Sequence, residues 1–169
     1  MDNMTLPSTK PSVSAWQHAL VAAGAVISAS ALGGLATAPN IPGWYAGLAK
    51  PSFNPPNWIF GPVWSLLYAM MGYAVYRVMR LPEATPGRMA ALVVFFGQLA
   101  LNAVWSWAFF AANSTTLGLA VIIPLLALII LTILRFRPLD RTAALLLVPY
   151  AAWVGFATVL NAAIWHLNR

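Results

Sequence analysis

The chain contains no cysteine, and only 7% of its 169 residues carry a charge. The lack of cysteine excludes disulfides, thiolate catalysis and cysteine-based metal sites. The lack of charge excludes an ordinary soluble domain, in which about 25% of residues are charged. Because 61% of the residues are hydrophobic, the composition instead indicates an integral, multi-pass membrane protein.

Acidic and histidine side chains are equally scarce. The acids Asp2, Glu83 and Asp140 all lie outside the apolar runs, whereas proton-coupled transporters and ion pathways usually place an ionisable residue at mid-membrane depth. His18 and His166 fall at opposite ends of the apolar region, about one bilayer thickness apart, so they cannot ligate one metal together. We therefore predict no catalytic residue, no metal site and no obligatory cofactor.

The nine basic residues give the chain a net charge of +6. They are too few and too scattered between apolar runs to form a nucleic-acid interface, so no nucleic-acid partner is expected. Their placement predicts topology instead, because loops on the cytoplasmic side of a membrane are enriched in Lys and Arg. The side expected to be cytoplasmic holds Lys10, Arg77, Arg80, Arg88, Arg135, Arg137 and Arg141, and the opposite side holds Lys50 and Arg169.

Five apolar runs dominate what is present, and each can cross ~30 Å of hydrocarbon as a helix. They lack the alternation of barrel strands, so an all-α, five-transmembrane-helix bundle is predicted. A polar tail, residues 1–15, is expected to be retained and not cleaved as a signal. The predicted membrane domain is 16–169, with spans 16–38, 57–77, 88–111, 115–134 and 142–165 and a lid loop at 39–56.

The predicted lid loop is rich in both prolines and aromatic rings, including the stretch NPPNW at 54–58. Prolines fix backbone angles and cannot continue a regular helix, and a loop of about 18 residues is usually either functional or disordered. This loop is too stiff and aromatic for disorder, so we expect it to cover one mouth of the bundle. Trp44 and Tyr45 would then point into a cleft, and Lys50 could meet a ligand carboxylate.

Three spans each carry aromatic and polar residues on one helical face. An amide in hydrocarbon costs several kcal/mol unless it is paired, so the amides need partners. One interpretation is glue between helices plus an interfacial aromatic belt; the other is a slot for a planar apolar ligand. The three faces are Trp64, Tyr68 and Met71; Gln98, Asn102, Trp105 and Phe109; and Tyr150, Trp153, Ala157 and Asn161.

Small residues recur four apart in the first span, as in the pairs Gly24 and Ser28, Ala29 and Gly33, and Ser30 and Gly34. Such spacing lets helix backbones approach closely. It predicts packing either inside one bundle or across a homodimer.

Four ordered motifs are spread along residues 44–161 of the chain, and the first 15 or so residues lie outside them. On these motifs the sequence resembles the TspO/translocator protein family, also called tryptophan-rich sensory proteins or the peripheral-type benzodiazepine receptor. The resemblance implies a five-helix bundle, often dimeric, that binds porphyrins such as protoporphyrin IX beneath the loop between helices one and two. The motifs are WYAGLAKPSFNPPNW (44–58), VWSLLY (63–68), QLALNAVWSWAFF (98–110) and VPYAAWVGFATVLN (148–161). The matching pocket positions are Trp44, Tyr45, Trp64, Asn102, Trp105, Trp153 and Ala157.

The resemblance also implies a role in tetrapyrrole regulation or stress response, in the inner or outer membrane of a bacterium, with membrane lipid as a neighbour. The family's sterol motif needs a tyrosine followed by a basic residue, but the corresponding region has Ala162, Ala163 and His166, so cholesterol binding is not expected. The resulting hypothesis is a porphyrin receptor or sensor. Its alternatives are a passive transporter of tetrapyrroles or lipids, and a light-dependent porphyrin-degrading enzyme in which Trp64 or Trp153 donates an electron.

Overall fold

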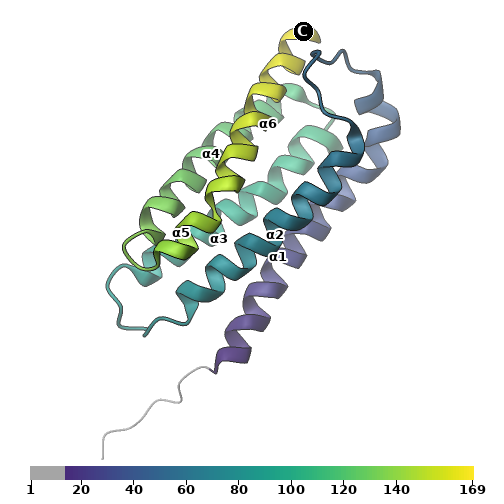
Figure 1. The fold of residues 1–169 in the computed structure, drawn as a ribbon. Coiled ribbons are helices and arrows are strands. Elements are labelled where there is room, and N and C mark those ends of the chain that lie inside the picture. Colours follow the sequence, from purple (N-terminus) through teal and green to yellow (C-terminus); the bar gives the residue numbers. More distant parts are fainter. Residues whose placement is uncertain (1–13) are drawn as a thin grey trace, which may run out of the picture.

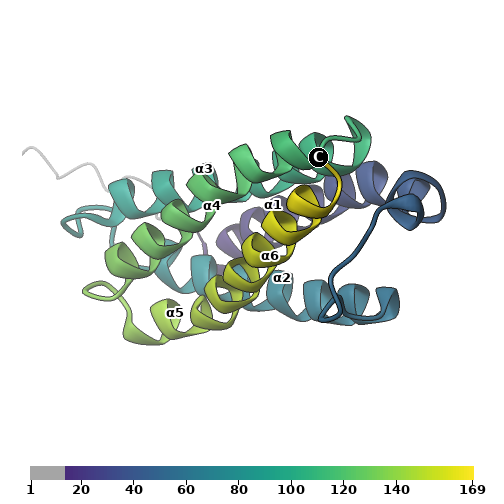
Figure 2. The same cartoon turned by 90° about the horizontal axis from the view of Figure 1, so that it is seen from above.

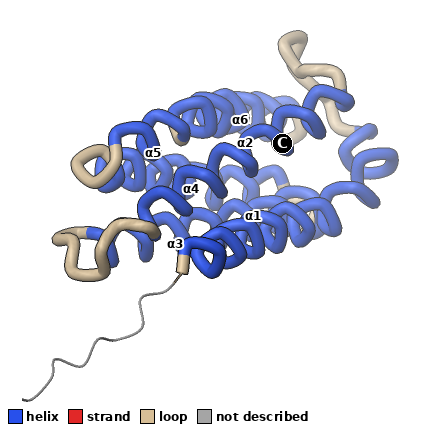
Figure 3. Tube along the Cα trace, turned by 60° about the horizontal axis from the view of Figure 1, so that its bottom comes forward, coloured by secondary structure: helices blue, strands red, loops and turns tan. Residues whose placement is uncertain are grey.

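A computed structural model describes residues 14–169 of the protein. These residues form helices joined by loops, and no strand occurs among them (Figure 3). The helices are α1 (Ala15–Thr37), η1 (Ala38–Asn40), η2 (Ile41–Tyr45), α2 (Asn57–Met79), α3 (Arg88–Ser106), η3 (Trp107–Ala111), α4 (Thr115–Phe136), α5 (Arg141–Leu146) and α6 (Val148–Leu167).

Five helical stretches are long and apolar enough to cross a membrane, which confirms the predicted all-α, five-span architecture. The protein is therefore an integral, multi-pass membrane protein. The stretches are Ala15–Tyr45, Asn57–Met79, Arg88–Ala111, Thr115–Phe136 and Arg141–Leu167.

The first stretch extends beyond residue 38, into the segment expected to be a loop. After α1, a 3-10 turn and a π turn carry the chain on to Tyr45. Pro39 and Pro42 stand in the first turns of these two segments, where the missing proline N–H has no helical partner to lose. Each proline thus interrupts the preceding helical hydrogen bonds and begins the next turn. The resulting change of direction places Tyr45 over the end of the bundle.

The bundle has two unlike ends (Figure 1). The segment joining α1 to α2 and the C-terminus lie together at one end, and the α2–α3 and α4–α5 connections lie at the other (Figures 1 and 2). At the latter end Arg77 forms an ion pair with Asp140, with 2.9 Å between Nε and Oδ2. Of the basic residues assigned to this side, Lys10 lies outside the described residues.

Asp140 also begins α5 by accepting a hydrogen bond from the Ala143 N–H at 2.9 Å. Burial raises the pKa of this carboxyl, but the Ala143 N–H and the Arg77 guanidinium outweigh it, so the pKa lies below its ordinary value. The side chain of Arg88 donates to the carbonyls of Val78 and Met79. The last carbonyls of α2 are therefore satisfied although they are buried.

The hydrophobic core lies toward this end of the bundle. Met71, Val75 and Val78 of α2, with Phe95 of α3 and Phe136 of α4, have no exposed surface. Where α1 crosses α2, a Cβ added at Gly72 would stand 3.3 Å from Val26, so the two helices are in close contact here.

The small residues of α1 were predicted to serve packing either inside one bundle or across a homodimer, and they lie on two different faces of the helix. Ala29 and Gly33 are buried inside the bundle, and a Cβ at Gly33 would stand 3.1 Å from the Ser106 hydroxyl of α3. Gly24, Ser28 and Gly34 instead lie on the exposed face of α1. Close packing within one bundle therefore accounts for only part of the pattern.

Candidate functional site

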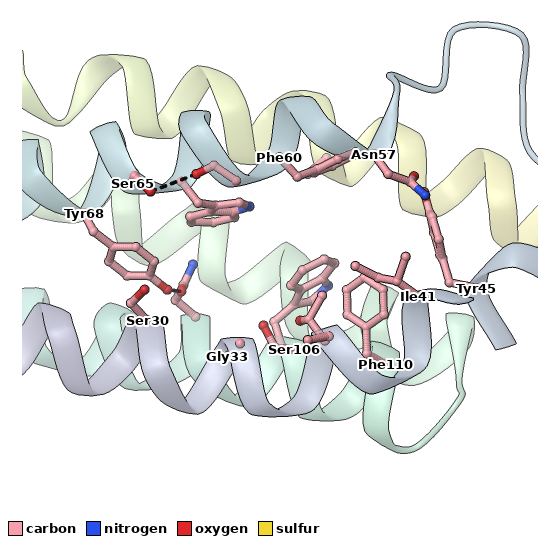
Figure 4. A pocket seen from close by; sticks show the side chains of 18 of the residues that line it. Ser30, Gly33, Ile41, Tyr45, Asn57, Phe60, Ser65, Tyr68, Ser106 and Phe110 are labelled. Atoms are coloured by element: carbon pink, nitrogen blue, oxygen red, sulfur yellow. Dashed lines mark hydrogen bonds between the residues drawn. The ribbon is translucent and has the colours of Figure 1, made fainter. Parts of the chain in front are cut away.

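A cavity of about 510 Å³ lies between α1 and α2, beneath the segment that joins them (Figure 4). Side chains from α1, η2, α2, α3, η3 and α6 line it. None of its described lining residues is charged, so it can bind a ligand only through shape, ring contacts and neutral hydrogen bonds.

Three indoles from three different helices border this cavity: Trp64 of α2, Trp105 of α3 and Trp153 of α6. The Trp105 ring stacks on Phe109 with centroids 5.4 Å apart, and Trp153 meets the edge of Phe60 at 5.7 Å. Such stacked and edge contacts fix ring orientation. The indoles therefore face one shared space. An interfacial belt would instead require them to face the acyl chains.

A chain of hydrogen bonds runs from the cavity into the core. The Tyr68 hydroxyl donates to Asn102 Oδ1 at 2.7 Å, and Asn102 Nδ2 donates to the Tyr150 hydroxyl at 3.1 Å. That hydroxyl donates in turn to Gln98 Oε1 at 3.0 Å. Because Asn102, Tyr150 and Gln98 are each at most 2% exposed, the chain supplies partners that hydrocarbon cannot, although Gln98 Nε2 has none within residues 14–169.

One polar donor beside the cavity is unused. The indole N–H of Trp153 is buried and has no hydrogen-bond partner within residues 14–169. By contrast, the Trp105 N–H reaches Asn161 Oδ1 at 3.4 Å. A buried donor without a partner costs free energy, so Trp153 is ready to donate to an acceptor on a ligand.

We call the segment over the cavity, residues 41–56, the roof. Tyr45 is its buried part, and the Tyr45 hydroxyl donates to Asn54 Oδ1 at 2.9 Å. Lys50 donates to the carbonyls of Ala46 and Leu48, and its ammonium lies 4.8 Å from the centre of the Tyr45 ring. The cation thus stabilises the fold of the roof itself.

A smaller void of about 40 Å³ lies beside the main cavity, bordered by Phe109 and Asn161. Asn161 Nδ2 donates to the Thr115 carbonyl at 3.0 Å. A Cβ added at Gly118 of α4 would stand 2.5 Å from Phe109 and 2.8 Å from Asn161. Glycine at 118 therefore makes room for the two side chains that support Trp105.

The structure distributes the sequence-predicted site residues over four places. Seven line the main cavity: Tyr45, Trp64, Tyr68, Asn102, Trp105, Trp153 and Ala157. Phe109 and Asn161 border the smaller void, and Gln98 and Tyr150 lie behind Asn102. Trp44 packs edge-on against Phe109 at 5.3 Å, and Lys50 stays within the roof. The role of all of them in ligand binding stays a prediction.

Sequence reasoning missed the wall that α1 contributes. Ser30, Gly33, Gly34 and Thr37 line the cavity, although small residues in α1 suggested only helix packing. The seven-residue spacing of Ser30 and Thr37, which places two hydroxyls on one face, was a signal. Trp58, at the start of α2, is 73% exposed and also borders the cavity.

Comparison with known proteins agrees with this architecture. The sequence pattern of the TspO/MBR family matches residues 20–166. The chain is 42% identical to the tryptophan-rich protein TspO of Archaeoglobus fulgidus, over 85% of this chain and 92% of that protein. It is 40% identical to the translocator protein of Homo sapiens, over 75% of each chain. It is 38% identical to the tryptophan-rich sensory protein of Cereibacter sphaeroides, over 74% of this chain and 77% of that protein. A match over this much of the chain shows that the protein belongs to the TspO/MBR family.

Proposed function

We propose that the protein is a membrane receptor or sensor that binds porphyrins and related planar apolar ligands in the cavity beneath the roof. The observation that carries the proposal is the convergence of Trp64, Trp105 and Trp153 on one uncharged cavity. A volume of about 510 Å³ falls within the range of small-molecule sites, which are typically aromatic with a few placed polar groups.

The chemistry of the lining defines the ligand further. Ring faces suit a flat apolar body, while the free Trp153 N–H and the hydroxyls of Ser30 and Ser65 suit neutral acceptors or donors. A carboxylate deep in this cavity would be desolvated without a cation to pair with. We therefore place the propionates of a bound porphyrin at the cavity mouth.

The proposal can be tested with purified protein in detergent or liposomes. Titration with protoporphyrin IX is expected to quench tryptophan fluorescence to saturation. Replacing two stacking rings, in a Trp64→Ala, Trp153→Ala double variant, should weaken binding by roughly 5- to 150-fold, because each ring contact contributes roughly 0.5–1.5 kcal/mol.

The matched control is a Trp16→Ala, Trp107→Ala double variant. Both of these indoles are exposed, at 62% and 49%, and neither lines the cavity. The control should bind like the wild-type protein. Equal affinity of the two double variants would remove the indole cavity from the binding site.

A second candidate function is passive transport of the same ligands, which is favoured by the exposure of the cavity between α1 and α2. The expected result is porphyrin flux into liposomes that contain the protein, beyond the flux into empty liposomes. Saturable binding with no added flux would reject passive transport and leave the receptor function as the proposal.

A further inference from the structure

The cavity is open on the side where α1 faces α2. Ser30 and Gly34 of α1 and Gly61 and Ser65 of α2 line it and are also exposed. We call these four residues the portal. All four lie within the apolar stretches Ala15–Tyr45 and Asn57–Met79, so their exposed surface faces acyl chains.

The depth of the portal supports this orientation. Gly61 and Ser65 follow the first residue of α2, Asn57, by about 6 and 12 Å of helix axis at 1.5 Å per residue. The portal therefore begins at least one helical turn below the helix end. Figure 4 shows the cavity side chains gathered between the α1 and α2 ribbons at this level.

The same two helices are closed against each other further along. A Cβ at Gly72 would meet Val26 at 3.3 Å, whereas one at Gly34 or Gly61 would meet no other described atom within 4 Å. The helices are thus in contact on the core side, whereas at the portal the cavity reaches the surface of the protein between them.

The roof at the aqueous end of the cavity is held in place by a side chain from the far end of the chain. Asn168 Nδ2 donates to the Ala49 carbonyl at 2.9 Å, and Asn168 Oδ1 accepts from the Ala49 N–H at 3.0 Å. The same Nδ2 donates to the Ile164 carbonyl of α6 at 2.7 Å. One carboxamide therefore ties the roof to the end of α6.

We propose that the ligand enters and leaves the cavity sideways from the lipid phase, through the portal, while the roof stays tied to α6 by Asn168. The identity of the ligand rests on the proposed function, but the route does not. The uncharged portal favours molecules whose apolar body dissolves in the membrane, and a carboxyl group passes it at the lowest cost in its protonated form, because moving an ionised group through hydrocarbon is costly. Ser30 and Ser65 offer hydroxyls to neutral polar groups that pass.

The kinetic test uses variants that narrow the portal and, separately, a variant that removes the hydrogen bonds between the roof and α6. Gly34→Leu and Gly61→Leu place side chains into open space, and leucine also favours helix. With protoporphyrin IX dissolved in the liposome lipid, stopped-flow quenching should show association and dissociation both slowed about tenfold, equivalent to ~1.4 kcal/mol of barrier. Asn168→Ala should leave both rate constants unchanged while hydrogen exchange at Ala49 becomes faster.

Gly24→Leu is the matched control, because Gly24 is an exposed α1 glycine with equally open space but lies away from the cavity. It should leave both rate constants unchanged. Portal variants that match this control would overturn the proposal. Faster association and dissociation of protoporphyrin IX in Asn168→Ala would overturn it too, because the route would then run through the roof.

A second measurement needs no porphyrin binding. The chain has no cysteine, so Ser106→Cys places a single thiol on the cavity wall. A lipid-dissolved maleimide should label it about tenfold more slowly once Gly34→Leu is added, again ~1.4 kcal/mol of barrier, and at the original rate with Gly24→Leu. Equal labelling rates in Ser106→Cys alone, with Gly34→Leu and with Gly24→Leu would reject the portal even if porphyrin binds. A protein that does not bind porphyrin but shows the expected labelling rates would reject only the proposed function.

Discussion

The two halves of α2 have the same kind of apolar sequence, but one half lines the cavity and the other packs in the core. None of residues 57–66 is buried, and Trp64 and Tyr68 border the cavity. Further along, Met71, Ala74 and Val75 have no exposed surface at all. Hydrophobicity therefore predicts that α2 crosses the membrane, but side-chain size and shape decide which half encloses a space.

The difference follows from what each half packs against. In the core half, Gly72 lets α1 approach closely, with Val26 lying against it, and Ala74 is fully buried. In the cavity half, large rings lean on one another, as Trp64 does on Tyr68 with centroids 5.6 Å apart. These contacts hold the rings at the wall, and the space that they enclose is the cavity of about 510 Å³.

The largest expected effect comes from comparing a ring of the core with a ring of the cavity by the same substitution. Phe95→Ala removes a ring with no exposed surface and should lower the free energy of unfolding by about 3–5 kcal/mol. Phe60→Ala removes a half-buried cavity ring, 5.7 Å from Trp153, and should cost much less stability while weakening porphyrin binding. Thermal unfolding in detergent measures the loss of stability, and quenching titrations measure porphyrin binding. Equal losses of stability in the two variants would contradict the distinction between core and cavity rings.

A smaller effect is expected at the contact between α4 and the smaller void. Gly118→Ala places a methyl group 2.5 Å from Phe109 and 2.8 Å from Asn161, and overpacking of this kind costs roughly 1–3 kcal/mol. Because Asn161 accepts from the Trp105 N–H, we also expect a shifted tryptophan emission maximum.

The control for this prediction is Gly97→Ala, at an exposed position of α3 with open space around the added methyl. It should be neutral or slightly stabilising, since alanine favours helix over glycine. If Gly118→Ala proved as stable as Gly97→Ala, the support of Trp105 by α4 would have to be abandoned.

The hydrogen-bond chain that joins the two halves gives a graded prediction. Tyr150→Phe leaves Asn102 Nδ2 and Gln98 Oε1 without their partner in a fully buried place, which should cost about 1–3 kcal/mol. Tyr68→Phe leaves only one buried atom, Asn102 Oδ1, without its partner, and should cost less than Tyr150→Phe. Both phenylalanine variants keep the ring, so unfolding midpoints compare the hydroxyls alone, and a reversed order would contradict the described chain of donors.

Sequence reasoning reached the five helices because long apolar runs leave few alternatives in a membrane. It also grouped Gln98, Asn102 and Trp105 on one face, since helical spacing alone brings them there. It did not give α1 its role as a cavity wall. Glycine and serine suit both close packing and an open portal, and only the neighbouring helix decides between Gly33, which meets Ser106, and Gly34, which meets open space.

The roof shows a second reason why sequence was insufficient. Lys50, as the single cation in an aromatic loop, suggested a partner for a ligand carboxylate. The structure instead gives its ammonium the carbonyls of Ala46 and Leu48. These short-range contacts depend on the turn that the chain makes after Tyr45, and the tie from Asn168 joins residues 119 positions apart. Residue types do not encode either geometry directly.

The smallest expected effect lies at the end of the bundle farthest from the cavity. Asp140→Asn keeps a side chain that can begin α5 but removes the charge that pairs with Arg77. Because the folded-state pKa of Asp140 lies below its ordinary value of 3.8, the carboxylate contributes stability that is present above that ordinary value. This contribution is lost as the pH falls through the folded pKa.

The unfolding midpoint of the wild-type protein should therefore exceed that of Asp140→Asn near neutral pH, and the gap should close in acid. Added salt should narrow the gap at neutral pH, because the Arg77 side chain is partly exposed and the pair is screened. Porphyrin affinity should be the same in both proteins, since the ion pair lies in the half of the molecule that encloses no cavity. A gap that persists undiminished at low pH would show that Asp140 acts through packing and not through its charge.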